Sequence, residues 1–507
     1  MLTEKTQGFL EAGEATLASE KEEAFLEAVC QEIKWRAAWP GIREELADHV
    51  AEHVHELAEE GVPQEEAQAQ ALAAMGDAGA IGRSLNELHR PQLAKGLLAL
   101  GVLLTAGGVV SILYAVAHGH FNQTVSTLVG VALGLLTAAI VYFSDYSRWL
   151  KWSPVLYGIG AAILIAVDMA GMEINGRQLW LGTSMLRVNG YMLAELFFAA
   201  AVAGCLVLFR DKGVGGLLGC GILAALSVGL IMHGDFTIAI IMAFGYVGLF
   251  TQAIRWGYFG DQRRRNYAIV YGTVGAVWLA IAAYILPASW RVNRIIGMLH
   301  PFDNVNSSGW VSSRAILTLQ HAQFIGPADM SGFGETGLSY HGILVEPMSN
   351  YALMRLINDF GLLAGLLVVI GLLALVVEGF SKVRLVRNHY GQLLGMASLI
   401  FLGGQSFVSI MINLGFAGFD ASLPFFTAGC SNMLASWLLL GILLAVWRRN
   451  TILVESRPAS RKSVKQSESI PHIIRWQEGC LIIDFGRWFG KNETVQQSEG
   501  GYDDGNR

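Results

Sequence analysis

The stretch EPMSNYALMRLINDFGLLAGLLVVIGLLAL, which runs from Glu346 to Leu375, decides how the fold is interpreted. Its second half is an apolar run of membrane-spanning character. Its first half carries polar side chains where a chain should enter lipid, at Glu346, Asn350, Arg355, Asn358 and Asp359. Such side chains are costly at membrane depth and indicate a functional site there, whereas above the hydrocarbon water would solvate them.

Composition defines the class of protein. Charged residues are 15% and hydrophobic residues 53% of the 507 residues, and the mean hydropathy of +0.44 is typical of a polytopic membrane protein. The net charge of −6 is small for this length, so no nucleic-acid partner is expected. The five cysteines have no metal-ligand spacing, so neither a disulfide framework nor a zinc site is indicated. No cleavable signal peptide is expected, because the chain begins with a charged segment of soluble character.

Ten apolar runs are long enough to span a bilayer as helices. They cover residues 96–117, 126–143, 152–171, 190–209, 214–232, 236–254, 267–287, 360–380, 392–412 and 424–447. We therefore predict an all-α membrane domain at residues 93–449. A small cytoplasmic helical domain at 1–92 precedes it, and a largely disordered cytoplasmic tail at 450–507 follows it, with one amphipathic segment, IIRWQEGCLIIDFGRWFG, suited to the membrane surface.

Basic residues orient the predicted bundle. With a cytoplasmic N-terminus, the short outer loops hold only Arg177 and Arg187. The short inner loops then hold Arg148, Lys151, Arg210, Lys212, Arg255, Arg263, Arg264, Arg265, Lys382, Arg384 and Arg387. This asymmetry satisfies the positive-inside rule, so both termini are predicted to be cytoplasmic. The long loop at 288–350 is then extracytoplasmic, and loops of that length usually carry function.

The N-terminal segment has the pattern of a compact helical module. WPGIREELADHVAEHVHELAEEG predicts a helix with apolar residues at helical spacing, namely Ile42, Leu46, Val50, Val54 and Leu57. Gly61 is a helix stop, and a second helix begins near Pro63 and breaks at Gly76. Through REELADHV, MGD and LHRP, the segment resembles the prefix domain ahead of some bacterial permeases and sporulation proteins, which implies docking or regulation and no chemistry.

One stretch in this module matches a metal-peptidase pattern. HVAEH has the spacing H-x-x-E-H, with His49 and His53 one helical turn apart. The same residues form the solvated face of the amphipathic helix, and the sequence offers no third ligand. We therefore predict no metal site.

Several motifs in the membrane domain occur in one order. NGRQLWLG (175–182) precedes the fourth run, HGDFTIA (233–239) opens the sixth, and WRVNRIIGMLHPFD (290–303) begins the long loop. SNYALMRLINDFG ends that loop, and NLGF (413–416) and LPFFTAGCSNMLASWLLLG (423–441) frame the last run. This series resembles the SEDS family of shape, elongation, division and sporulation proteins, which includes FtsW, RodA and SpoVE.

The resemblance implies a peptidoglycan glycosyltransferase. Such a protein polymerises lipid II, an undecaprenyl-linked precursor, at the outer face of the bacterial cytoplasmic membrane, beside a class B penicillin-binding protein. A sugar hydroxyl attacks an anomeric carbon that carries a pyrophosphate leaving group, so a carboxylate is needed as general base. Cationic side chains or a divalent cation would offset the pyrophosphate charge. Two alternatives stay open: a catalytically degenerate scaffold or regulator, and a transporter of the lipid-linked precursor.

The chain departs from the family at the residues that matter most. The family motif P-E-x-H-T-D-F aligns with residues 345–351, which keeps the glutamate as Glu346 but puts Asn350 at the essential aspartate. An amide cannot accept the proton, so Glu346 becomes the predicted substitute base. In the following E-E-x-G motif only Asp359 remains acidic, and on a helix it can pair with Arg355. The lysine of the fourth-helix motif is replaced by Glu195.

The resemblance implies substrate-binding roles for Arg177, Trp180, Glu195, Asp235, Arg291, Arg294 and Asp359. Plain structural roles compete with several of these. Arg177 and Trp180 suit an interfacial anchor, Arg291 and Arg294 suit cations that reach from a helix end into water, and Asp235 suits a helix N-cap, which is the favoured role.

The topology can be tested with reporters. A reporter fused after Arg449 should report the cytoplasm, and one inserted near Ser331 should report the outside, because the basic residues orient the ten helices in this way. The opposite result at either position would contradict the ten-helix arrangement.

Overall fold

The computed structural model describes residues 20–118, 123–174, 177–183, 186–285, 287, 289–303, 305, 307–328, 350–416, 418–451, 474–477 and 480–483. Two compact units divide the chain, Met1–Ser456 and Arg457–Arg507. The first contains the helical N-terminal segment and the helix bundle, and the second contains the tail.

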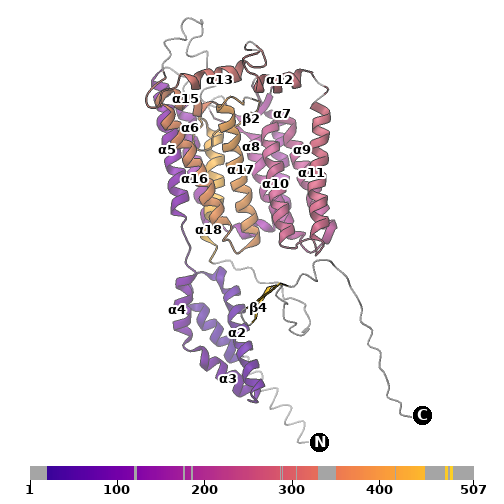
Figure 1. Cartoon of the computed structure of the whole chain (residues 1–507). Coiled ribbons are helices and arrows are strands. Elements are labelled where there is room, and N and C mark those ends of the chain that lie inside the picture. The colour runs from indigo at the N-terminus through magenta and orange to yellow at the C-terminus, as the bar shows by residue number, and fades with distance from the viewer. Residues whose placement is uncertain are drawn as a thin grey trace, which may run out of the picture. The chain divides into compact units, whose positions relative to one another are not determined.

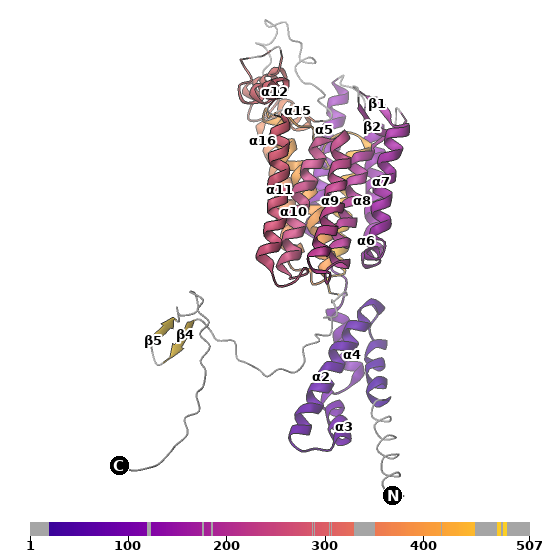
Figure 2. The same cartoon turned by 90° about the vertical axis from the view of Figure 1, so that its right-hand side faces the viewer.

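The ten predicted runs are all helical, and the helices stand side by side as one bundle (Figures 1 and 2). They are α5 (Lys95–Ala117), α6 (Thr124–Phe143), α7 (Ser153–Ala170), α8 (Gly190–Leu208), α9 (Gly213–Gly234), α10 (Phe236–Arg255), α11 (Arg263–Ile285), α16 (Leu362–Val383), α17 (His389–Asn413) and α18 (Cys430–Arg448). Within the described residues, nine of them are long and apolar enough to cross a membrane. The remaining predicted run falls in α11, which has 23 residues. The predicted all-α membrane fold is confirmed.

Smaller elements gather at one end of the bundle, which we call the site end (Figures 1 and 2). They are α12 (Ser289–Leu299), α13 (Trp310–Gln320), α15 (Ala352–Phe360), β1 (Met172–Ile174), β2 (Arg177–Gly182) and β3 (Arg187–Asn189). The three strands form an antiparallel sheet in the order β1-β2-β3, which the sequence analysis did not predict. At Gly182 φ is +118°, so a glycine suits the turn between β2 and β3.

The last membrane helix begins later than predicted, at Cys430 instead of residue 424. Side chains hold residues 423–429 in a turn, since the Leu423 N–H donates to Thr427 Oγ1 at 2.8 Å and the Phe425 N–H to Ser436 Oγ at 3.1 Å. Phe425 has φ of +63°, outside the helical region. Apolar residues therefore extend the run into a segment whose backbone is not helical.

Small residues let α6 and α18 approach closely. Gly130, Gly134 and Ala138 follow one face of α6 at intervals of four residues. A Cβ added at Gly130 would lie 2.6 Å from Cys430 Cα on α18, and one added at Gly441 would lie 2.7 Å from Ala138 Cα. Close backbone approach through small residues is a main source of packing between helices in lipid.

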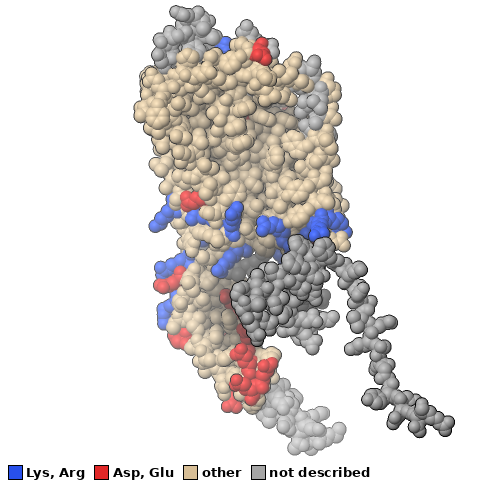
Figure 3. All heavy atoms as spheres, viewed as in Figure 1, with Lys and Arg blue, Asp and Glu red and all other residues tan. Residues whose placement is uncertain are grey.

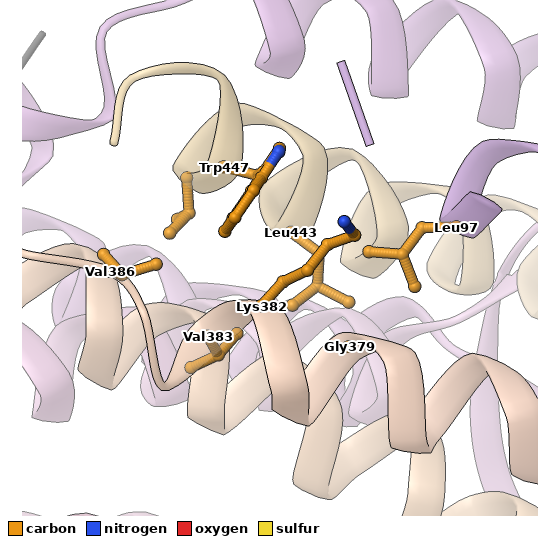
Figure 4. A pocket seen from close by; sticks show the side chains of 8 residues that line it. Leu97, Gly379, Lys382, Val383, Val386, Leu443 and Trp447 are labelled. Atoms are coloured by element: carbon orange, nitrogen blue, oxygen red, sulfur yellow. The ribbon is translucent and has the colours of Figure 1, made fainter. Parts of the chain in front are cut away.

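Lys and Arg side chains form a band at the opposite end, the basic end (Figure 3). A small hollow lies at this end, lined by Leu97, Gly379, Lys382, Val383, Val386, Leu443, Val446 and Trp447 (Figure 4). Lys382 Nζ lies 4.5 Å from the centroid of the Trp447 ring and 3.7 Å from Glu378 Oε1. The cation in this hollow is thus already compensated, and none of the predicted site residues lines it.

The N-terminal segment forms the predicted helical module. Residues 20–31 are helical, followed by η1 (Arg36–Ala38), α2 (Trp39–Glu59), α3 (Gln64–Met75) and α4 (Ala78–Leu88). Its core contains Leu26, Val29, Ile33, Ile42 and Leu46. The positive φ of Gly61 and Gly76 ends α2 and α3 where the sequence predicted.

The histidines of the HVAEH stretch pair with glutamates on the same helix. His49 Nδ1 lies 3.8 Å from Glu52 Oε2, and His53 Nδ1 lies 3.1 Å from Glu56 Oε2. All four side chains are exposed, as expected for the solvated face of α2. In the described parts of the chain, no three His, Cys, Asp or Glu side chains are grouped to hold a metal ion.

The described residues of the tail form a hairpin of β4 (Ile474–Gln477) and β5 (Cys480–Ile483). The strands pair antiparallel, with Trp476 opposite Leu481. This hairpin lies in the segment expected to lie on the membrane surface. The remaining residues of the predicted disordered tail after 451 lie outside the described residues.

The close packing of α6 and α18 predicts a large effect of a small substitution. Gly130→Val should lower the stability of the protein by about 1–3 kcal/mol, because the added atoms overlap the backbone of α18. Gly158→Val on α7 is the matched control, since its Cβ meets no described atom within 4 Å. Thermal unfolding of both variants in detergent measures the difference, and equal midpoints would contradict the packing argument.

Candidate functional site

The motifs that are distant in the sequence come together at the site end. Backbone and side-chain hydrogen bonds join HGDFTIA, SNYALMRLINDFG and the segment that begins with NLGF. A hydrogen bond also joins β3 to the motif LPFFTAGCSNMLASWLLLG, since the Asn189 N–H donates to Ser431 Oγ at 2.8 Å. The site is therefore assembled from four separate parts of the chain.

Asn413, the last residue of α17, holds the start of α15. Its Nδ2 donates to the Asn350 carbonyl at 2.8 Å and to the Ser409 carbonyl at 2.7 Å. Its Oδ1 accepts from the Met354 N–H at 2.8 Å. One buried amide thus satisfies the backbone on both sides of the entrance to α15.

Asn350, at the position of the family aspartate, contacts a carboxylate. Its Nδ2 donates to Asp420 Oδ1, and the Asp420 N–H in turn donates to Thr237 Oγ1 at 3.0 Å. Thr237 lies in the first turn of α10, within the HGDFTIA motif. The Asp420 side chain is exposed and Asn350 is half-buried, so both lie at an accessible surface.

Arg355 and Asp359 pair as the helical spacing predicted. Arg355 Nη1 lies 3.7 Å from Asp359 Oδ2, with side-chain exposures of 0% and 6%. The same nitrogen donates to the Ser111 carbonyl of α5 at 2.8 Å. Both side chains are buried in protein. The alternative that water solvates these polar residues above the hydrocarbon is therefore wrong for Arg355 and Asp359.

A glycine separates α15 from the membrane helix that follows it. Gly361 has φ of +96°, and an added Cβ would lie 2.7 Å from the Phe324 carbonyl oxygen. The first N–H groups of α16 find acceptors there, since Leu362 donates to the Gln323 carbonyl at 2.9 Å and Leu363 to that of Phe324 at 3.1 Å. The first two N–H groups of α16 are therefore hydrogen-bonded across the break in the helix.

Glu195 and Asp235 form a second acidic part of the site. Glu195 on α8 is 1% exposed, and its Oε1 accepts no hydrogen bond from the described residues. Asp235 caps α10, accepting from the Ile238 N–H at 2.9 Å, so the favoured N-cap role is confirmed. Asp235 also lies close enough to act electrostatically on Glu195.

Trp180 belongs to the sheet and not to a loose loop. It lies on β2 opposite Asn189 of β3, and the Arg187 guanidinium carbon lies 5.5 Å from the centroid of its ring. Arg177 begins the same strand, opposite Ile174. Trp180 therefore lies on a strand of the sheet, and both its anchoring role and its substrate-binding role stay predictions.

The side chains of four predicted site residues lie outside the description, and one of them is that of Arg177 on β2. Glu346 lies outside the described residues, so its role as substitute base stays a prediction. Arg291 and Arg294 belong to α12, but their side chains lie outside the description. α12 itself approaches the segment of Asp420, since a Cβ added at Gly418 would overlap Met298 Sδ.

The sequence analysis allowed a divalent cation at the site. Among the described residues, the acidic side chains there are too few to form a group of three ligands. Glu195 and Asp235 supply two carboxylates, and the chain as described groups no third ligand with them. The divalent cation stays a prediction, and no step of the chemistry below depends on one.

Asp420 and Asn413 are the site residues that the sequence analysis missed. Asn413 begins the NLGF motif but was not selected, because its role depends on the backbone of a distant segment. A signal for Asp420 was available, since it is the only charged residue in the stretch 410–430. Its proximity to Asn350, 70 residues away in the sequence, was not predictable.

A ten-helix bundle with buried polar side chains at one end defines a polytopic membrane protein with a candidate site at that end. The family model described as cell cycle protein, FtsW/RodA/SpoVE, matches residues 89–452. The chain belongs to this family, which confirms the sequence resemblance.

Individual relatives agree with this assignment. The chain is 23% identical over 368 residues to a probable peptidoglycan glycosyltransferase FtsW of Allochromatium vinosum, covering 70% of this chain and 87% of the relative. It is 25% identical over 378 residues to the protein of the same name from Nitrosococcus halophilus, covering 71% and 92%. Among solved structures, a chain of a peptidoglycan synthase complex matches with a TM-score of 0.57 and 20% identity, over 71% of this chain and 98% of that one. The structural likeness confirms the fold.

The Arg355–Asp359 pair predicts an asymmetric effect of substitution. Asp359→Asn should lower the stability by roughly 3–5 kcal/mol, because it removes the charge that compensates a fully buried guanidinium. Asp211→Asn is the control, since Asp211 pairs with Arg210 at 3.5 Å but is 92% exposed and should contribute little. Thermal unfolding compares the two, and similar losses would contradict the burial argument.

Proposed function

We propose that this chain is a peptidoglycan glycosyltransferase that polymerises lipid II at the outer face of the bacterial cytoplasmic membrane. The relatives of the same family carry that name, and the chain aligns with them over most of their length. A class B penicillin-binding protein is the proposed partner, and cell division, shape or sporulation is the proposed process.

One observation carries the proposal, namely the convergence of the family motifs at the site end. Asn413, Asn350, Asp420 and Thr237 form a continuous hydrogen-bonded series across α17, α15 and α10. A packing role alone would be satisfied by apolar side chains, whereas polar groups at this depth are costly and are retained for function. Within the series Asp420 is exposed and Asn350 is half-buried, so a substrate can reach these two side chains.

The orientation follows from the basic residues. Lys and Arg side chains band the end opposite the site (Figure 3), and that end is the cytoplasmic one by the positive-inside rule. The site end then faces the outside, where cell-wall polymer is made. Both termini are cytoplasmic in this arrangement.

The reaction requires proton removal from the acceptor sugar hydroxyl and stabilisation of the leaving pyrophosphate. A carboxylate at the entrance to α15 supplies the first. Arg291 and Arg294 on α12 are the proposed cations for the second, because α12 packs against the segment of Asp420 through Met298. The prenyl chain stays in the surrounding lipid.

A degenerate scaffold is the second candidate function. It is favoured by the amide at Asn350 and by the buried Glu195 where the family has a cation. Such a protein binds the lipid-linked precursor without reacting with it.

The purified full-length chain in liposomes with labelled lipid II tests the proposal. A ladder of glycan polymer is expected, and a class B penicillin-binding protein should increase its yield. Protein-free liposomes and liposomes with an unrelated multi-pass protein are the controls. Binding of lipid II without polymer, with or without the partner, would support the scaffold, and protein-dependent movement of labelled lipid II across the bilayer would support a transporter.

A further inference from the structure

We propose that Asp420 is the catalytic base of this chain and replaces the aspartate that the family has at position 350. The inference rests on the proposed function, and it assigns the proton acceptor to a residue outside the motif that normally carries it. Three observations support the assignment: contact, anchoring and exposure.

Contact places the Asp420 carboxylate beside the family position. Asn350 stands at the aligned aspartate, and its Nδ2 donates to Asp420 Oδ1. The carboxylate therefore lies one side-chain contact from the place where the family carboxylate would be. Asn350 itself cannot serve as base, because an amide has no lone pair that accepts a proton at neutral pH.

Anchoring fixes the backbone around Asp420 through three sets of contacts. The Asp420 N–H donates to Thr237 Oγ1 at 3.0 Å, at the start of α10. The preceding segment packs under the long-loop helices, since a Cβ at Gly415 would lie 2.9 Å from Ile316 of α13. Ala421, the next residue, is buried with Tyr351 and Met354 of the α15 region. A fixed carboxylate needs little reorganisation when the reaction occurs.

Exposure leaves the carboxylate available to a substrate. Asp420 is exposed, although its neighbours Ala421 and Asn413 are buried. Asn350 occupies Oδ1 alone, so Oδ2 can accept a hydrogen bond from the acceptor hydroxyl. The Asn350 amide thereby orients the carboxylate and donates no proton in the reaction.

The step balances with these groups alone. The Asp420 carboxylate takes the proton of the acceptor sugar hydroxyl while that oxygen forms a bond to the anomeric carbon of the donor. The bond between the anomeric carbon and the pyrophosphate oxygen breaks, and undecaprenyl pyrophosphate leaves with the electron pair. The protonated Asp420 then returns its proton to solvent, to which it is exposed.

A carboxylate exchange tests the assignment in liposomes containing the full-length chain, labelled lipid II and the class B penicillin-binding protein. Asp420→Asn is expected to lower kcat at least about 100-fold, the usual contribution of a positioned general base. Its lipid II binding and thermal midpoint should stay unchanged, because an asparagine oxygen can still accept from Asn350. A loss of binding or stability together with kcat would indicate a structural role and overturn the assignment.

The reciprocal variant supplies the rescue. Asn350→Asp combined with Asp420→Asn keeps the hydrogen bond with its direction reversed and returns the carboxylate to the family position. Most of the lost activity should return. Glu173→Gln, at an exposed carboxylate of β1 at the same end, is the matched control and should keep parental activity.

The remaining outcomes separate the two proposals. Polymer from the parent together with full activity in Asp420→Asn would overturn the role of Asp420 alone, and loss of activity in Glu346→Gln would then assign the base to Glu346. No polymer from the parent or from any variant would overturn the proposed function and the inference with it. Polymer from the reciprocal variant only would identify a decayed site and equally overturn the assignment of Asp420.

Discussion

The amide of Asn413 is the interaction on which the site end depends. It joins the last turn of α17 to the backbone at both sides of the start of α15, with two hydrogen bonds of 2.8 Å. In lipid, a helix that starts at membrane depth exposes N–H groups that water cannot reach, and each would cost several kcal/mol. Asn413 removes that cost at one position and fixes α15 at the same time. Asn350 then faces Asp420, and Arg355, one turn further on, reaches the carbonyl of Ser111 on α5.

The same constraint explains why α15 and α16 are two helices instead of one. A continuous helix from residue 352 to 383 would carry Arg355 and Asp359 on a membrane-spanning segment. The break at Gly361 makes α15 a separate short helix whose residues Ala352 to Asp359 are buried by protein. Carbonyls of residues 323 and 324 accept from the first two N–H groups of α16, so these groups stay hydrogen-bonded at the break. The polar residues of α15 are thus enclosed by α13, α17 and the end of α5. Protein packing, and not water, surrounds them.

Periodicity and apolar length predicted the bundle because each membrane helix satisfies its own backbone and needs only about 20 apolar residues. The pairing of Arg355 with Asp359 and the cap at Asp235 were predictable for the same reason, since both are local to one helix. The three-stranded sheet, the turn at 423–429 and the contact between Asn350 and Asp420 were not. Each depends on which distant segments meet, for example Ser436 with the Phe425 N–H, and a single sequence does not contain that information. Glu195 was predictable in part. The sequence showed that it replaces the lysine of the family motif, but it did not show that the side chain is buried.

Chemistry constrains where a carboxylate lies in space and leaves open where it lies in the sequence. A proton acceptor must reach the substrate hydroxyl within hydrogen-bond distance, and any chain segment that passes that point can supply it. The stretch between NLGF and LPFF passes that point because the Asn413 clamp holds one side of it and the turn at 423–429 holds the other. Since the stretch is short, Asp420 has few positions open to it, and its backbone bond to Thr237 selects one of them. The amide at position 350 then does not mean that the site lacks a base. It becomes the donor that a carboxylate on the neighbouring segment requires, and exchanging the two side chains preserves both the hydrogen bond and the charge of the site.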